Sequence, residues 1–219
     1  MTLRLIECGA SRSLPEGDRL RQPAELDCKV LLIVGGTSVD RAKALAEVNA
    51  ATESVVAVEL ETECLEFHHG KRDGQVDNIV GFARFRLGVA EPSDLIEVVR
   101  TNATSAAAID AIRNCFESVG LSVSICRDFH GRIVDTLFRP FINSALAAVD
   151  EGLAEPGEMD KALRLGLGYP EGPIEIMDRT GYTEHFEVSN SLYESTGSEE
   201  FKPARKSRVL AMRKKAGLA

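Results

Sequence analysis

The sequence lacks several features that would assign a class at once: it has no tryptophan, 5% aromatic residues and no Cys-x-x-Cys pair among its five cysteines. Cysteines in this arrangement predict neither a zinc site nor a disulfide framework, and unpaired thiols are typical of a reducing compartment. No apolar run approaches the roughly 20 residues that cross a bilayer, and no secretory leader is recognisable. We therefore expect a cytoplasmic protein without membrane spans.

An excess of positive charge is also missing. The net charge of −8 disfavours nucleic acid or a membrane surface as the main partner. The charge is uneven, because residues 202–219 contain seven Lys/Arg and no acid, which leaves 19 basic against 34 acidic residues, a charge of −15, in residues 1–201. A basic C-terminal helix of this kind binds an anion, docks on the acidic body, or complements its own helix dipole in solvent.

Residues 1–127 are predicted to form a small α/β domain. Apolar, β-branched runs alternate with a helical stretch, Thr37–Ala50, and with a second helix that Ser105 can cap and Gly120 can end. Strand, helix and strand of these lengths indicate a βαβ unit with a parallel sheet. The expected strands are Leu3–Ile6, Lys29–Gly36, Ser54–Glu61, Asn78–Phe85, Asp94–Arg100 and Leu121–Ile125.

Gly35 and Gly36 end the second of these strands, where glycines in a dinucleotide-binding fold let the backbone approach a pyrophosphate. The chain continues G-G-T-S-V-D, without the third glycine of the full fingerprint. The pair is therefore either a weak cofactor-binding turn or a plain turn from strand to helix. The missing glycine favours the plain turn, so we expect that NAD binds weakly or not at all.

Residues 128–219 are helical in character. Within residues 131–149, apolar side chains form two adjacent rows at a spacing of four, which start at Ile133 and Val134. Two rows make a stripe too wide for a helix that lies on one surface. Further helices are expected over Glu158–Gly166, from Pro173, over Thr183–Ser195 and over Pro203–Lys215. We expect an all-α bundle that forms a homodimer to cover its apolar surface.

The stretch from Cys126 to Ala162 and its continuation resemble the C-terminal domain of the 3-hydroxyacyl-CoA dehydrogenase family. The family pattern D-x-P-G-F-[IV]-V-N-R, followed by L-x-P-x-x-N, is matched at Asp128, Gly131, Ile133, Val134, Pro140 and Asn143, with Leu137 one residue further from Pro140 than in the pattern. Later matches include Glu151-Gly152, Asp160, Tyr169-Pro170, Gly172-Pro173, Asp178 and Gly181. The resemblance implies a shortened Rossmann-like α/β domain followed by an all-α helical bundle, as in the second half of the long bacterial 3-hydroxybutyryl- and 3-hydroxyadipyl-CoA dehydrogenases.

Departures from the family pattern fall at positions that carry its chemistry. The histidine of G-x-H-F-F-N-P, the family's general base, is replaced by Ala83, which cannot accept a proton. The glutamate that orients this histidine is retained as Glu97, either as a catalyst or as a carboxylate with a structural partner. The asparagine of V-N-R is replaced by Asp135, which accepts but does not donate hydrogen bonds at neutral pH. The acids of Glu61–Cys64, where the family has S-N-T-S-S, would repel a CoA or nicotinamide diphosphate.

Histidines elsewhere could supply the missing base. His130 stands where the family usually has proline, and it could act with Asp128 or Asp135, or be a surface or packing residue. His68 and His69 are expected in an exposed loop, where a metal site would need a carboxylate from another segment.

Three residues are candidates for substrate binding. Arg84 and Arg86 alternate on one strand and face the same side, so they either bind a phosphate or carboxylate or pair with the acidic body. The family pattern implies a substrate-binding role for Asn143.

Three functions are compatible with this mixture. The leading hypothesis is a 3-hydroxyacyl-CoA dehydrogenase-family protein that is catalytically incomplete alone and serves as a dimerising or acyl-CoA-holding partner, for example of a separate dehydrogenase chain. The alternative is an active NAD-dependent dehydrogenase that uses His130 or Glu97 as the base. The third is an enzyme of different chemistry on an acyl-CoA-like substrate, with Asp135 as the acid or base.

Overall fold

The structure is a computed structural model, and it describes residues 3–21, 29–70, 77–88 and 90–218. The chain divides into two compact units, the first within Met1–Arg86 and Pro92–Ile133, the second within Leu87–Glu91 and Val134–Ala219. The division falls six residues after the expected boundary between residues 127 and 128. The second unit also includes a short loop, in which a Cβ on Gly88 would lie 1.7 Å from the carbonyl oxygen of Thr180.

A six-stranded sheet forms the centre of the first unit, and its spatial order follows the chain from β1 to β6. All neighbouring strands pair in parallel except β4 and β5, which are antiparallel. The short connection between these two strands allows only a reversal of direction, because a parallel pair needs a longer crossover. The strands are β1 Leu3–Glu7, β2 Val30–Val34, β3 Val55–Glu59, β4 Ile79–Arg84, β5 Leu95–Arg100 and β6 Ser122–Arg127.

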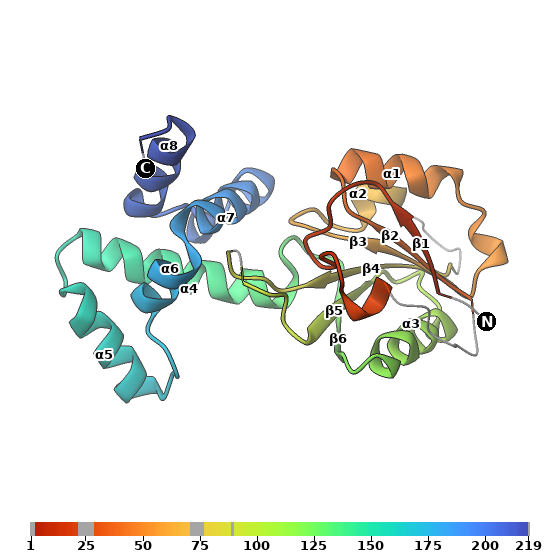
Figure 1. Cartoon of the computed structure of the whole chain (residues 1–219), viewed down its shortest axis with the longest axis horizontal. Helices are drawn as coiled ribbons and strands as arrows, with labels where there is room; N and C mark the ends of the chain where they lie inside the picture. Colours follow the sequence, from red (N-terminus) through yellow and green to blue (C-terminus); the bar gives the residue numbers. More distant parts are fainter. Residues whose placement is uncertain (1–2, 22–28, 71–76, 89, 219) are drawn as a thin grey trace. The chain divides into compact units, whose positions relative to one another are not determined.

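Helices cover both faces of this sheet. On one face lie α1 (Ser38–Glu47) and α2 (Glu66–His69), and α3 (Ala106–Ser118) lies on the other (Figure 1). Because β2 and β3 are buried on both faces, they are apolar at every position except the terminal Glu59. Alternate residues of the central strands therefore enter two separate cores, one shared with α3 and one shared with α1.

Local hydrogen bonds explain where the helices of this unit begin. Thr37 forms a capping box with Asp40 at the start of α1. Ser105 caps α3 by accepting a bond from the amide of Ala108, which confirms the expected cap. Helix α2 has only four residues and was not expected.

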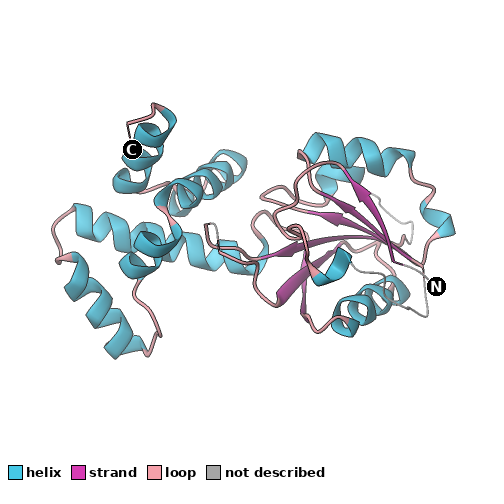
Figure 2. Cartoon of the chain, in the orientation of Figure 1, coloured by secondary structure: helices cyan, strands magenta, loops and turns pink. Residues whose placement is uncertain are grey.

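The second unit consists of helices (Figure 2). Its core gathers side chains from three of them, including Ile142, Leu146, Ile174 and Met177. Within the described residues the helices are α4 Arg132–Asp150, α5 Pro156–Leu167, α6 Pro173–Thr180, α7 Tyr182–Thr196 and α8 Arg205–Lys215.

Helix α4 buries only part of the apolar face that its sequence pattern indicates. Leu137, in the first apolar row, is 69% exposed, while Asp135 and Asn143 on the polar side are buried. The second row is covered within its own unit, since Ile142 and Leu146 are fully buried. The polar side is buried because it faces complementary polar groups, which form the network described below.

No helix in the described ranges is long and apolar enough to cross a membrane. Cys8, Cys64, Cys115 and Cys126 are free thiols, and Cys28 lies outside the described residues.

Candidate functional site

The turn after β2 is packed against the chain's own backbone. Gly35 and Gly36 both have a positive φ, of 74° and 64°. A Cβ on Gly35 would lie 2.0 Å from the carbonyl oxygen of Gly9, and one on Gly36 would lie 2.6 Å from that of Cys8. Glycine is required here because residues 8–10 occupy the space beside the turn.

The polar groups of the same turn are also engaged inside the protein. The Gly35 amide donates to Glu59 at 2.7 Å, and the Gly36 amide donates to the carbonyl of Ala10 at 3.2 Å. Both glycine carbonyls accept from the buried guanidinium of Arg41. A pyrophosphate cradle needs free amides that point at the ligand, and these amides point into the fold.

The strand order gives a second test of a dinucleotide site. Doubly wound folds bind their cofactor at the carboxyl ends of strands, at the point where the strand order reverses. The described strands run from β1 to β6 without reversal. Neither the turn geometry nor the topology of the described residues fits a bound NAD.

The segment after β3 carries a buried charged cluster. Glu63 accepts from Arg41 at 2.7 Å and contacts Nε2 of His68 at 3.1 Å. Burial opposes ionisation of Glu63, but the bonds from His68 and Arg41 outweigh it and lower its pKa to about 2. His68 lies in α2 with a buried side chain, so the expectation of an exposed loop was wrong for it. Among the described residues, no group of three or more potential ligands could hold a metal ion.

Ala83 and Glu97 lie directly opposite each other on β4 and β5. The Glu97 carboxylate is 2% exposed, accepts from the amide of Ile133 at 2.8 Å, and forms an ion pair with Arg132 at 3.5 Å. Arg132 also donates to the carbonyl of Glu61 at 2.7 Å. Glu97 therefore binds the first turn of α4, where a carboxylate is favoured by unpaired amides and by the helix dipole. The sequence allowed two interpretations of Glu97, a catalyst or a carboxylate with a structural partner, and these contacts give it such a partner.

His130 and Asp128 contact different parts of the chain. Nδ1 of His130 lies 3.1 Å from the carbonyl oxygen of Thr62. The carboxylate of Asp128 accepts from the amides of Leu65 and Glu66 at 2.7 and 2.8 Å, at the start of α2. Asp128 therefore has a capping role.

Arg84 pairs with groups inside the protein, which is one of the two alternatives that the sequence allowed. Its guanidinium is buried and donates to Asp18 and to the carbonyls of Ser13, Pro92 and Ser93. Arg86 follows the end of β4, and its carbonyl accepts a bond from Arg12 at 2.8 Å.

The second unit contains a buried polar network between α4 and α7. Asp135 accepts from Nε of Arg139 at 2.7 Å, and Nη1 of Arg139 lies 3.3 Å from Nδ1 of His185. Nε2 of His185 lies 2.9 Å from Oδ1 of Asn143, whose amide nitrogen donates to the carbonyl of Phe201 at 3.2 Å. Two of the predicted site residues, Asp135 and Asn143, are thus brought into one chain of hydrogen bonds.

The network fixes the protonation of His185. Burial disfavours the imidazolium, and the Arg139 cation repels it, which lowers the His185 pKa to about 3. Neutral His185 accepts at Nδ1 from Arg139 and donates from Nε2 to Asn143, so both ring nitrogens are satisfied. Asp135 is neutralised by an arginine inside the same unit.

The family model of the 3-hydroxyacyl-CoA dehydrogenase C-terminal domain matches residues 131–219. By this match, which covers less than half of its length, the chain resembles the 3-hydroxyacyl-CoA dehydrogenase family in its C-terminal domain. It is 30% identical over 110 residues to the probable 3-hydroxybutyryl-CoA dehydrogenase of Deinococcus radiodurans, over 50% of this chain and 40% of that protein. It is 34% identical over 105 residues to the 3-hydroxyadipyl-CoA dehydrogenase of Escherichia coli, over 48% of this chain and 22% of that protein. The chain thus spans less than half the length of these relatives.

Solved structures of similar proteins have the same fold. The (S)-3-hydroxybutyryl-CoA dehydrogenase of Ralstonia eutropha superposes with a TM-score of 0.70 at 22% identity, over 86% of this chain and 66% of that chain. The 3-hydroxybutyryl-CoA dehydrogenase of E. coli gives 0.69 at 24% identity, over 87% and 41%. The expected architecture, a Rossmann-like domain followed by a helical domain, is confirmed.

Three residues of these clusters were missed from the sequence: Arg132, Arg139 and His185. Arg132 stands at the phenylalanine position of the family pattern, and Arg139 lies four residues after Asp135 on the same helix, so the Asp-Arg pair at i,i+4 is a readable signal. His185 gave no signal, because its partner Arg139 lies 46 residues away along the chain.

Substituting Gly35 tests whether the turn is open. We expect Gly35→Ala to lower the free energy of unfolding by more than the ~1–2 kcal/mol of a left-handed alanine, because its Cβ meets the Gly9 carbonyl. Gly17→Ala is the matched control, since Gly17 has a φ of 82° and no atom within 4 Å of the added Cβ. Urea denaturation measures both, and equal losses would contradict the closed turn.

The network also predicts the pH dependence of stability. The unfolded chain protonates His185 near its ordinary pKa of 6.5, whereas the folded chain does so only near 3. The unfolded state therefore binds more protons in this window, and stability falls with decreasing pH by up to ~1.4 kcal/mol per unit. The contribution of Glu63, whose pKa is lowered from 4.5, is lost only at lower pH. Urea denaturation between pH 7 and 5 measures the slope.

The variant His185→Gln keeps one acceptor and one donor but cannot titrate, so its slope should be shallower by close to one proton. His69→Gln, outside the network, is the control. Parallel slopes for the parent and His185→Gln would show that the imidazole is not held neutral.

Proposed function

We propose that this chain does not catalyse hydroxyacyl-CoA oxidation by itself and acts as a dimerising or acyl-CoA-holding partner in acyl-CoA metabolism. The observation that carries the proposal is the pairing of Ala83 with Glu97 on adjacent strands. By the resemblance, this is where a histidine and its orienting glutamate would form the general base. Here the side chain of Ala83 has no polar atom, and Glu97 is bound to the start of α4.

The state of Glu97 argues against its use as the base. Its carboxylate accepts from the Ile133 amide and pairs with Arg132, and both contacts stabilise the charged form. A general base must instead have a lone pair within reach of the substrate proton and a pKa near the working pH. Proton abstraction at this position therefore has no group to perform it.

The turn after β2 supports weak or absent NAD binding. The amides of Gly35 and Gly36 are satisfied by Glu59 and Ala10, and their carbonyls by Arg41. A diphosphate would have to displace these bonds and approach the acids Glu61 and Glu63.

Helix α5 supports self-association. It is exposed along nearly its whole length, with Leu165 79% exposed, and of its residues only Asp160 is buried. Leu153, before the helix, and Leu137, on α4, are also exposed. Burying such side chains gains about 1.5–3 kcal/mol each, so a two-fold contact between helical units would cover them.

Turnover assays test the proposal. The purified chain should not oxidise 3-hydroxybutyryl-CoA with NAD, because the general-base contribution of roughly 10²–10⁴-fold is absent. Ala83→His alone should not restore the reaction, since Glu97 remains bound to Arg132. If the chain holds acyl-CoA, acetoacetyl-CoA should raise the melting temperature without NAD.

Two results would contradict the proposal. Turnover by the unmodified chain that disappears in His130→Gln would favour an active dehydrogenase with a rearranged base. Turnover or acid–base chemistry that disappears in Asp135→Asn, with folding intact by circular dichroism, would favour the different-chemistry alternative. Absence of both turnover and CoA-thioester binding would leave dimerisation as the role of the chain.

Sedimentation velocity tests the homodimer. The chain should sediment as a dimer at micromolar concentration, and Leu137→Asp or Leu165→Asp should shift it toward monomers. Leu146→Asp is unsuitable, because Leu146 lies in the core of its own unit. Val39→Asp, at an apolar position on α1 that is 49% exposed, is the control and should leave the dimer intact. A well-folded monomer for the unmodified chain would refute the assembly.

A further inference from the structure

Helix α8 buries two small residues, leaves Leu210 half-buried and exposes the large apolar side chains of Val209 and Met212. Ser207 and Ala211 are buried, and α8 contacts α7. Val209 is 43% exposed and Met212 64% exposed, one helical turn apart on the opposite side. A helix whose only role is to cover its own unit would present the larger apolar side chains to that unit. The outward face of α8 is therefore organised for a contact.

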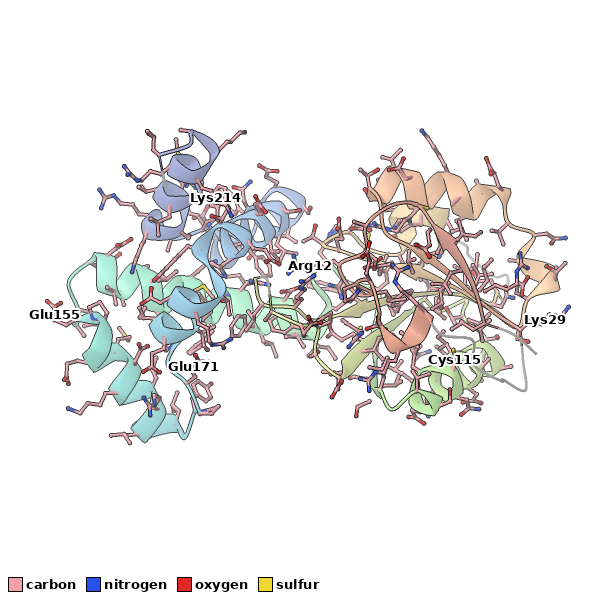
Figure 3. All side chains as sticks on the ribbon, viewed as in Figure 1. Arg12, Lys29, Cys115, Glu155, Glu171 and Lys214 are labelled. Atoms are coloured by element: carbon pink, nitrogen blue, oxygen red, sulfur yellow. The ribbon has the colours of Figure 1, made fainter. Side chains whose placement is uncertain are left out.

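Cations surround these two apolar side chains. Helix α8 contains six Lys/Arg and no acid: Arg205, Lys206, Arg208, Arg213, Lys214 and Lys215. Lys206 lies over the ring of Tyr182 at 4.7 Å, and Arg213 donates to the carbonyl of Leu218. Within the described part of the chain, Arg205, Arg208, Lys214 and Lys215 form no ion pair. Figure 3 labels Lys214 on this helix.

The helix dipole does not account for half of these charges. The last-turn residues Arg213, Lys214 and Lys215 are favoured by the negative end of the dipole. Arg205, Lys206 and Arg208 lie in the first turns, where the dipole disfavours cations, and the Asp150 carboxylate caps this end by accepting from the amide of Lys206 at 3.0 Å. Asp150 answers the helix start, whereas the exposed side chains of Arg205 and Arg208 form no ion pair among the described residues and can meet an external anionic group.

We propose that the outward face of α8, defined by Arg205, Arg208, Val209, Met212 and Arg213, docks an acidic helix of a partner protein. Carboxylates at i,i+3 or i,i+4 spacing would meet the arginines, whose planar guanidinium groups bind carboxylates in a bidentate manner. Apolar side chains between the carboxylates would cover Val209 and Met212. An apolar centre with a charged rim, rich in Met and Arg, is the usual anatomy of a protein interface.

Other occupants fit this face less well. A symmetric contact of α8 with α8 of a second copy would oppose six cations to six. A bilayer helix needs a broad apolar side with Trp, Phe or Leu, and this face offers one valine and one methionine.

The test uses the full chain and a synthetic 20-residue helical peptide in which glutamates flank a leucine stripe. Fluorescence anisotropy should show binding that weakens as salt rises. The double variant Arg205→Glu/Arg208→Glu should lose at least tenfold in affinity, and Met212→Ser should lose a smaller factor that salt does not change. A peptide with lysines in place of the glutamates should regain affinity for the double variant only.

Controls separate docking from folding and from simple charge. The double variant places acids in the first turn of α8, which favours the helix, so circular dichroism should be unchanged. Lys43→Glu, an exposed site on α1, changes charge away from the face and should leave affinity unaltered.

Four results would overturn the proposal. The first is that the peptide does not bind, and the second is that Lys43→Glu loses as much peptide affinity as the double variant. The third is that the chain binds vesicles of 30% phosphatidylglycerol in phosphatidylcholine but not the peptide. The fourth is that the chain self-associates in a salt-sensitive way that the double variant abolishes, again without binding the peptide.

Discussion

The buried carboxylate of Glu97 is the constraint on which much of this molecule depends. A charge that is 2% exposed must be paired and hydrogen-bonded, because an uncompensated buried carboxylate is strongly destabilising. With alanine at position 83, the start of α4 and Arg132 satisfy this requirement. Arg132 has a φ of 54°, a left-handed conformation that a non-glycine residue adopts at a cost. The ion pair and the bond to Glu61 offset that cost.

The second unit meets the same requirement in another way. Asp135 and Asn143 lie on the side of α4 that carries the polar residues, and that side faces α7. Arg139, itself 1% exposed, neutralises Asp135, and neutral His185 connects the pair to Asn143. Removing Arg139 would take away the cation that neutralises the buried Asp135, at a cost of the order of 3–5 kcal/mol for a broken charged pair. The polar side of α4 thus serves to position helices, and Ile133 and Leu137 remain exposed on α4.

The sequence was informative wherever a local rule determines the structure. The strand expected over Lys29–Gly36 is Val30–Val34, and the cap expected at Ser105 is present, because burial pattern and capping are local properties. Helix α2 was missed since four residues carry no periodicity. The inward orientation of Asp135 was also missed, because hydrophobic periodicity assumes that polar residues face solvent. Asp135 faces inward because the network on that side includes His185. The pairing of His185 with α4 leaves no pattern in the nearby sequence.

The family positions that this chain retains explain why it keeps the fold although reactive residues of the pattern are replaced. Asp160 is buried and accepts from the amides of Ile174 and Glu175, so it caps α6 from α5. A Cβ on Gly172 would lie 2.3 Å from Asp160, which requires glycine before Pro173. These residues match the pattern because they close a helix start, a task independent of any substrate. Catalysis requires instead that specific side chains face a reacting atom, and at position 83 such a side chain is missing. The family match therefore reports backbone geometry, and the function must be inferred from the side chains that replace the family's reactive groups.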